Sequence, residues 1–104
     1  MIKITESTGN VFNDLGFVNA DELQAKSALA RQISIAIKEK KLKQREAEEI
    51  TGVNQGDISK IINGHCDRFS IDRLFSMLLK LGQDIEINVH PSRSNLGHIS
   101  FMQA

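Results

Sequence analysis

The feature that most constrains this chain is a short break, Gly52-Val53-Asn54, between two segments of helical character. Residues 44–51 are rich in helix formers, and Gly52 can adopt the left-handed backbone conformation that ends a helix and opens a tight turn. Asn54 is a good N-cap for residues 55–63, in which isoleucines recur three and four residues apart. Two helices this short need a longer helix to pack against.

A longer helix is expected from Asp21 to about Lys41, where neither Gly nor Pro occurs. Acidic residues lie at its start and lysines at its end, as the helix dipole favours. Its apolar stripe consists of Leu29, Ile33, Ala36 and Ile37. Ser70 is an N-cap for a further helix over 71–81, which ends before Gly82. The predicted fold class is therefore all-α.

The hydrophobic period changes after this last helix. Residues 84–90 alternate strictly between polar and apolar side chains before Pro91, a pattern typical of a half-buried strand. A lone strand is unstable because its backbone groups need partners. The sequence leaves three candidates open: the N-terminal residues around Ile2 and Ile4, a second copy of the chain, or another protein.

The 104 residues suffice for one domain. We expect an irregular N-terminal arm over 1–19, the helical domain with its C-terminal strand over 20–91, and a tail over 92–104. No stretch approaches the roughly 18 apolar residues of a membrane span. The first residues lack the apolar run of a secretory signal, and Cys66 is the single cysteine. These features predict a cytoplasmic protein without membrane contact.

The formal net charge is zero, from 13 basic and 13 acidic residues. A neutral chain is not expected to coat nucleic acid indiscriminately, so any nucleic-acid site depends on local charge. Five basic residues gather between positions 38 and 45, namely Lys38, Lys40, Lys41, Lys43 and Arg45. Taken alone, such a run is usually a solvated helix end. Its position before the two short helices gives it a second possible use, at the edge of a DNA groove.

Two short helices joined by a tight turn form a helix-turn-helix when packed under a longer helix. The turn lets the second helix project into a major groove about 12 Å wide. The expected buried face is Ala47, Ile50, Val53, Ile58, Ile61 and Ile62. The expected outer face is Gln55, Gly56, Ser59, Lys60 and Asn63.

The segment LKQREAEEITGVNQGDISKIINGHCDRFSIDRLFSMLLKLGQDIEINV resembles the Xre/Cro-type DNA-binding domain, and NVFNDLGF resembles the arm of one subfamily. The resemblance covers about residues 10–90. It implies a five-helix, lambda-repressor-like helix-turn-helix bundle with one short C-terminal β-strand. Members are commonly antitoxins of Hig-type toxin-antitoxin modules or small transcriptional regulators.

The resemblance also implies roles for individual residues. Gln44 matches a glutamine that touches the phosphate backbone or braces its partner, and Gln55 matches one that can bond adenine through N6 and N7. Ser59, Lys60 and Asn63 lie where members touch bases or phosphates. Gly56 and Asp57 lie where the helix backbone approaches the groove, and Asp57 could accept from cytosine N4. The full set of expected DNA-binding residues is Lys43, Gln44, Arg45, Asn54, Gln55, Gly56, Asp57, Ser59, Lys60 and Asn63.

Three positions depart from the family pattern. Glu48 stands where a small residue normally lets the two helices approach, and Thr51 stands where a larger apolar residue is usual. Lys43 replaces the more usual Ser or Thr cap. We expect Glu48 to turn outward, to pair with a base such as Lys60, or to open the angle between the helices.

Neither a metal site nor a cofactor nor an enzyme is expected. The histidines and Cys66 lack ligand spacing, and no carboxylate pair, phosphate loop or nucleophile triad occurs. Cys66 is expected to be an ordinary loop thiol. The leading hypothesis is a homodimer that binds double-stranded operator DNA and represses its own operon. The resemblance adds an antitoxin role against a RelE-like ribonuclease toxin; the alternatives are a protein-interaction module without DNA binding and a stand-alone phage-type repressor.

Overall fold

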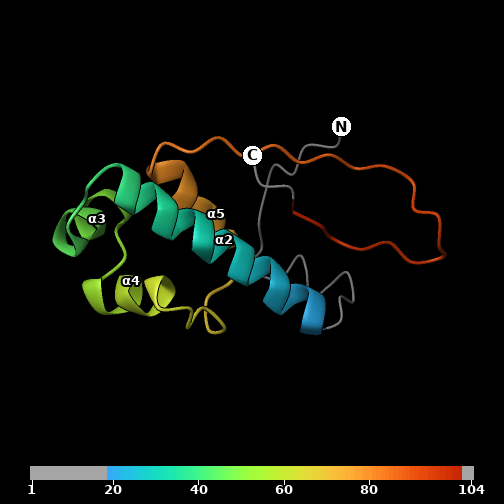
Figure 1. Ribbon diagram of the computed structural model, residues 1–104, viewed down its shortest axis with the longest axis horizontal. Helices are drawn as coiled ribbons and strands as arrows, with labels where there is room; N and C mark the ends of the chain where they lie inside the picture. Colours follow the sequence, from blue (N-terminus) through green and yellow to red (C-terminus); the bar gives the residue numbers. More distant parts are fainter. Residues whose placement is uncertain (1–18, 102–104) are drawn as a thin grey trace.

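The computed structural model describes residues 19–101 of the chain, and these residues contain four helices. In chain order they are α2 (Asn19–Glu39), α3 (Gln44–Thr51), α4 (Gln55–Ile62) and α5 (Ile71–Lys80). The long helix α2 packs against α4 and α5, and α3 packs against α4 and α5 (Figure 1). The predicted all-α class and the four helical segments are confirmed, with ends that differ by one or two residues.

The core lies where all four helices meet. Its largest fully buried side chains are Ile33 from α2, Ile58 and Ile61 from α4, Leu74 and Met77 from α5, and Leu81. Helix α3 contributes Ala47, whose small side chain is fully buried and lets α3 lie close to the others. The predicted stripe of α2 is buried throughout. Truncating one of the large residues to Ala would cost about 2–5 kcal/mol of stability.

Helix α2 ends two residues earlier than the sequence indicates. Lys41 has a φ of 55°, and the N–H of Leu42 bonds to the carbonyl of Ile37 at 3.0 Å. This is the hydrogen-bond pattern of a Schellman cap, in which a left-handed residue closes the helix. Leu42 then packs against the core, which directs the chain into α3.

Two features of the expected bundle are not found in residues 19–101: a fifth helix and the C-terminal strand. Residues 84–90 are extended but make no ladder there. The alternation correctly predicted which side chains are turned away from solvent, because Ile85 and Ile87 are half-buried while Asp84 and Glu86 are exposed. The alternation does not indicate whether a neighbouring strand exists, and a β-strand needs such a neighbour for its backbone hydrogen bonds.

Three side chains differ from their predicted burial. Ile50 and Ile62 are 41% and 37% exposed, because the inner faces of α3 and α4 are filled by Ala47, Ile58 and Ile61. Cys66 is buried in the core rather than in an open loop, beside the equally buried Phe69. The loop between α4 and α5 therefore closes one side of the core.

A buried lysine, which the sequence analysis did not single out, holds this loop to α2. The Nζ of Lys26 donates to the backbone carbonyl of Asp67 at 3.0 Å and lies 3.6 Å from a carboxylate oxygen of Glu22. Lys26 is 9% exposed, and its ammonium therefore depends on these two partners in place of water.

None of the helices in residues 19–101 is both long and apolar enough to cross a membrane.

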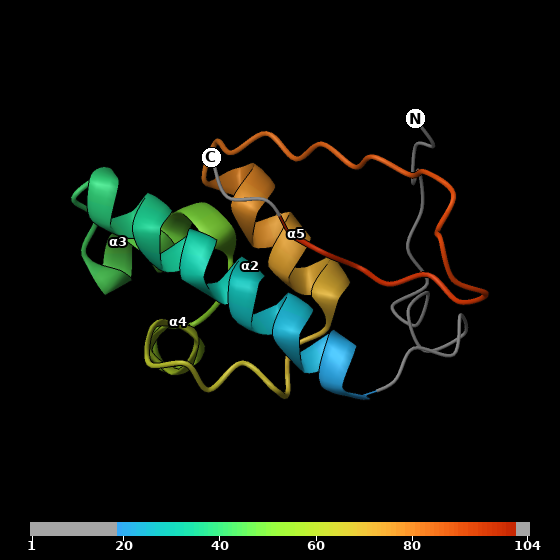
Figure 2. The ribbon, with the colours of Figure 1, turned by 45° about the vertical axis from the view of Figure 1, so that its right-hand side comes forward.

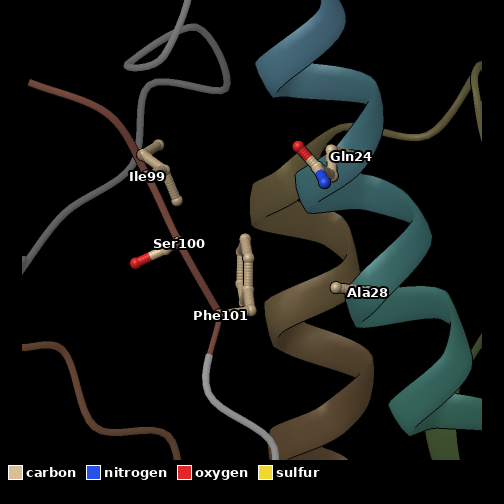
Figure 3. A pocket seen from close by; sticks show the side chains of 5 residues that line it. All are labelled: Gln24, Ala28, Ile99, Ser100 and Phe101. Atoms are coloured by element: carbon tan, nitrogen blue, oxygen red, sulfur yellow. The ribbon is translucent and has the colours of Figure 1, made fainter.

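Beyond α5 the chain runs extended along the outside of the helices, bends over residues 93–96 and returns (Figure 2). The returning tail and α2 enclose a hollow of about 310 Å³, lined by Gln24, Ala28, Ile99, Ser100 and Phe101. Figure 3 shows Ile99 and Phe101 turned toward the helices and Ser100 turned away. The predicted N-terminal arm lies outside the described residues, except for its last residue, Asn19, which starts α2.

Candidate nucleic-acid interface

The turn between α3 and α4 has the predicted left-handed glycine. Gly52 has φ 76° and ψ 8°, and its N–H bonds to the carbonyl of Glu48 at 2.8 Å. Thr51, the unusual residue before it, is buried; its hydroxyl donates to the carbonyl of Ala47 at 2.7 Å and accepts from the N–H of Val53 at 3.2 Å. The threonine thus satisfies two backbone groups of a tight buried turn, which an apolar residue could not do.

The first turn of α4 is held by two side chains. A carboxylate oxygen of Glu48 accepts from the N–H of Gln55 at 2.9 Å, and Asn54 accepts from the N–H of Asp57 at 2.8 Å. The expected N-cap role of Asn54 is confirmed. Of the possibilities considered for Glu48, pairing with Lys60 is not found; the carboxylate instead joins α3 to the start of α4 and is stabilised there by the positive end of the helix dipole.

The outer face of α4 is polar. Gln55, Gly56, Lys60 and Asn63 are exposed, and Ser59 is half-buried. Gln55 is the first residue of α4, and Asn63 is its C-cap. The amide nitrogen of Asn63 donates to the carbonyl of Ser59 at 2.9 Å and lies 3.3 Å from its hydroxyl. Four of the five members of the predicted outer face are therefore exposed, and the amide of Asn63 is bonded back to Ser59.

Asp57 is surrounded by donors. Its carboxylate lies 3.3 Å from the amide nitrogen of Asn54, 3.9 Å from the ammonium of Lys60 and 3.4 Å from the guanidinium of Arg73. The Arg73 guanidinium also stacks 5.0 Å from the ring centre of Phe69. Asp57 therefore links α4 to the first turn of α5. Sequence reasoning missed Arg73; the available signal was a basic residue three positions after the N-cap Ser70.

The five residues of the basic run are all exposed, at the end of α2, in the following loop and at the start of α3. They are Lys38, Lys40, Lys41, Lys43 and Arg45. Lys43 is the N-cap of α3 without a side-chain cap bond; its own N–H donates to the carboxylate of Glu46 at 2.8 Å. The N-terminal ends of α3 and α4 thus carry four exposed polar residues, Lys43, Gln44, Arg45 and Gln55.

A metal site and a ligand cavity are the other kinds of site that the described part of the chain could hold. No group of three or more His, Cys, Asp or Glu side chains there could hold a metal ion. The hollow beside the tail is open and contains no titratable side chain.

A family model described as a helix-turn-helix domain matches residues 11–90. The chain belongs to this helix-turn-helix family. The protein is also similar to a solved structure described as an XRE-family transcriptional regulator, with 31% sequence identity and a TM-score of 0.75. The match covers 84% of this chain and 100% of that one. A search of curated proteins gave no match.

The helix-turn-helix protein is thus of the XRE type. Its two motif helices are α3 and α4, and α4 is the second, which in such motifs lies in the major groove. The ten residues expected to bind DNA lie at the starts of α3 and α4, in the turn and along the outer side of α4. The side chains of Asn54, Asp57, Ser59, Lys60 and Asn63 make contacts within the protein.

Proposed function

We propose that this XRE-type protein is a sequence-specific DNA-binding transcriptional regulator. The observation that carries the proposal is the polar outer face of α4, where Gln55, Gly56 and Lys60 are exposed on a helix whose start is held by Glu48 and Asn54. A helix that is held firmly and carries hydrogen-bonding side chains suits selective contact with base edges in a major groove. We propose binding and not catalysis as the activity.

Within this proposal, each predicted residue has a separate task. Gln55 and Ser59 contact base edges, and Gly56 admits close approach of the helix backbone. Lys60, Asn63, Gln44, Lys43 and Arg45 contact phosphates, with Lys38, Lys40 and Lys41 beside them. The phosphate contacts supply the salt-dependent share of the affinity. A neutral chain with this local basic run favours a specific site over general coating.

Asn54 and Asp57 have an indirect task in the proposed complex. The Asp57 carboxylate is engaged by Asn54, Lys60 and Arg73, so we assign it to positioning α4 rather than to accepting from cytosine. Asn54 caps α4 and holds the same carboxylate. The positive charges of Lys60 and Arg73 also offset the negative charge of Asp57 on the surface that would face phosphates, which argues against the alternative of a protein-interaction module without DNA binding.

We further propose a homodimer whose two α4 helices contact half-sites about one helical turn apart, in an operator of its own operon. The resemblance to Hig-type antitoxins supports a second role, the neutralisation of a RelE-like ribonuclease toxin. The exposed tail and the extended residues 84–90 are candidate surfaces for that partner. Co-purification with the product of the adjacent reading frame tests the antitoxin role; a gene without such a neighbour favours a stand-alone phage-type repressor.

The DNA-binding proposal is tested by electrophoretic mobility shift with the protein's own upstream region at low salt. The double variant Gln55→Ala/Lys60→Ala is expected to lose the shift at concentrations where the wild type gives a full one. The matched control is Gln24→Ala/Arg31→Ala, which removes one amide and one positive charge from exposed positions of α2. No shift for the wild type, or equal shifts for both double variants, would contradict the proposal.

A further inference from the structure

Residues 84–90 form an extended segment on the outside of the helical body (Figures 1 and 2). One face of it is apolar: Ile85 and Ile87 are half-buried, and Val89 is 54% exposed. The other face is polar and exposed, with Asp84, Glu86, Asn88 and His90. Pro91 follows directly and lacks the N–H that a ladder needs, so the segment has a defined end.

Among the described residues, the backbone of this segment has no partner strand. Within residues 19–101, no hydrogen bond joins the backbone groups of 84–90 to another backbone group. An extended segment with unpaired N–H and C=O groups is a sheet edge, and an added strand satisfies it. The exposed Val89 shows that part of its apolar face also lacks cover from the described residues.

We infer that the added strand is residues 84–90 of a second copy of this chain, in an antiparallel pair with Ile87 opposite the partner's Ile87. A two-fold axis then passes beside Ile87, and the interface is isologous, as in most homodimers. The inference extends the proposed function, because it names the surface of the proposed homodimer.

The side-chain sequence of the segment favours this register. With Ile87 at the axis, Ile85 faces the partner's Val89 and covers its exposed side chain, and Asp84 faces the partner's His90. Apolar cross-strand pairs stabilise a ladder, and a ring N–H of His90 can donate a hydrogen bond to the Asp84 carboxylate. The same pairing places Glu86 opposite the partner's Asn88, so that no two like charges face each other.

The neighbouring symmetric registers are less favourable. An axis at Glu86 places two carboxylates directly opposite each other, which destabilises a strand pair. An axis at Asn88 places Ile85 opposite the partner's Pro91, which has no N–H to donate. A shift of the pairing by one residue is also unfavourable, because the apolar side chains of one strand would then lie opposite polar side chains of the other. The segment is thus self-complementary in one register.

Disulfide trapping tests both the pairing and its register. In a Cys66→Ala background, Ile87→Cys should form a cross-linked dimer with oxidised glutathione, seen on a non-reducing gel. Opposed residues have Cβ atoms about 4.5–5.5 Å apart, close enough for a disulfide after a small adjustment. Glu86→Cys is the matched control and should stay uncross-linked alone, but should cross-link when mixed with Asn88→Cys.

Light scattering on the otherwise unaltered protein gives the second measurement. The wild type is expected to be a dimer, and Val89→Lys should raise its dissociation constant at least tenfold, whereas Leu96→Lys, at an exposed tail position, should not. A monomeric wild type, a dimer unaffected by Val89→Lys, or equal cross-linking of Glu86→Cys and Ile87→Cys would overturn the inference. Thermal unfolding of each variant verifies that it remains folded.

The same samples separate this inference from the DNA-binding proposal. A mobility shift that survives for wild type while the cross-linking pattern fails would leave the DNA-binding function standing and place the dimer contact elsewhere. The reverse result, specific cross-linking without any shift, would support the strand pair and contradict DNA binding.

Discussion

The Glu48 carboxylate lies 2.9 Å from the backbone nitrogen of Gln55 and accepts its hydrogen bond. An acidic side chain of α3 thereby caps α4, across the turn that Gly52 closes. A free N–H at a helix start is one of the groups that must find a partner outside the helix. The position where a small residue is usual in similar proteins is therefore occupied by a residue that stiffens the joint between the two motif helices.

Glu48→Ala should lower the free energy of unfolding by about 0.5–2 kcal/mol, the range found for loss of a helix cap. Glu48→Gln retains an acceptor oxygen and should lose less. Urea denaturation measures both. The exposed neighbour on the same helix, Glu49→Ala, is the control. Equal stability of Glu48→Ala and wild type would show that the Gln55 N–H finds an equivalent partner without this carboxylate.

Thr51→Val should destabilise the protein by about 1–3 kcal/mol, because it keeps the shape but leaves the buried N–H of Val53 without its acceptor. Thr51→Ser keeps the hydroxyl and should retain most of the stability. The comparison by thermal or chemical unfolding isolates the hydroxyl from side-chain volume. The reverse order, with Ser worse than Val, would indicate that packing of the methyl group dominates at this turn.

Lys26→Met should cost about 1.5–3 kcal/mol, the range for a hydrogen bond that involves a charged group, since it leaves the carbonyl of Asp67 and the carboxylate of Glu22 without their donor. Lys38→Met, at an exposed position of the same helix, serves as the control and should change stability little. Hydrogen exchange of the loop between α4 and α5 should rise in Lys26→Met alone. Unchanged exchange there would argue against a role of Lys26 in holding that loop.

Asp57 and Arg73 should show a coupling of about 0.2–1 kcal/mol in a double-mutant cycle of Asp57→Asn and Arg73→Gln, because both groups are partly exposed and water screens their attraction. The coupling should fall as salt is raised. Its absence at low salt would mean that Arg73 is held by Phe69 alone.

In DNA titrations, two kinds of contact should be distinguishable. Lys43→Ala should weaken binding similarly for all sequences and reduce the slope of log K against log salt by about 1. Gln55→Ala should cost about 1–3 kcal/mol on the preferred operator and relax the preference at one base pair, with the salt slope unchanged. Interchanged behaviour of these two variants would contradict the tasks assigned to them.

Much of this protein follows from local sequence signals. The helix-ending glycine at Gly52, the caps Asn54 and Ser70, and the apolar stripe of α2 all predicted the elements that the structure contains. These signals are local because capping and left-handed turns involve residues a few positions apart. They sufficed to predict a helix-turn-helix and its outward-facing side chains.

Contacts between elements depended on tertiary structure. The partners of Glu48, Lys26 and Asp57 lie 7, 41 and 16 residues away along the chain, and only the packing of the helices determines which groups meet. The exposure of Ile50 and the burial of Cys66 have the same origin, since both depend on which neighbours fill the core. The sequence by itself determined which segments are helical, with ends correct to within one or two residues, and that residues 84–90 extend. The fold decided which polar groups satisfy one another, because desolvated donors and acceptors pair with whatever the packed helices place beside them.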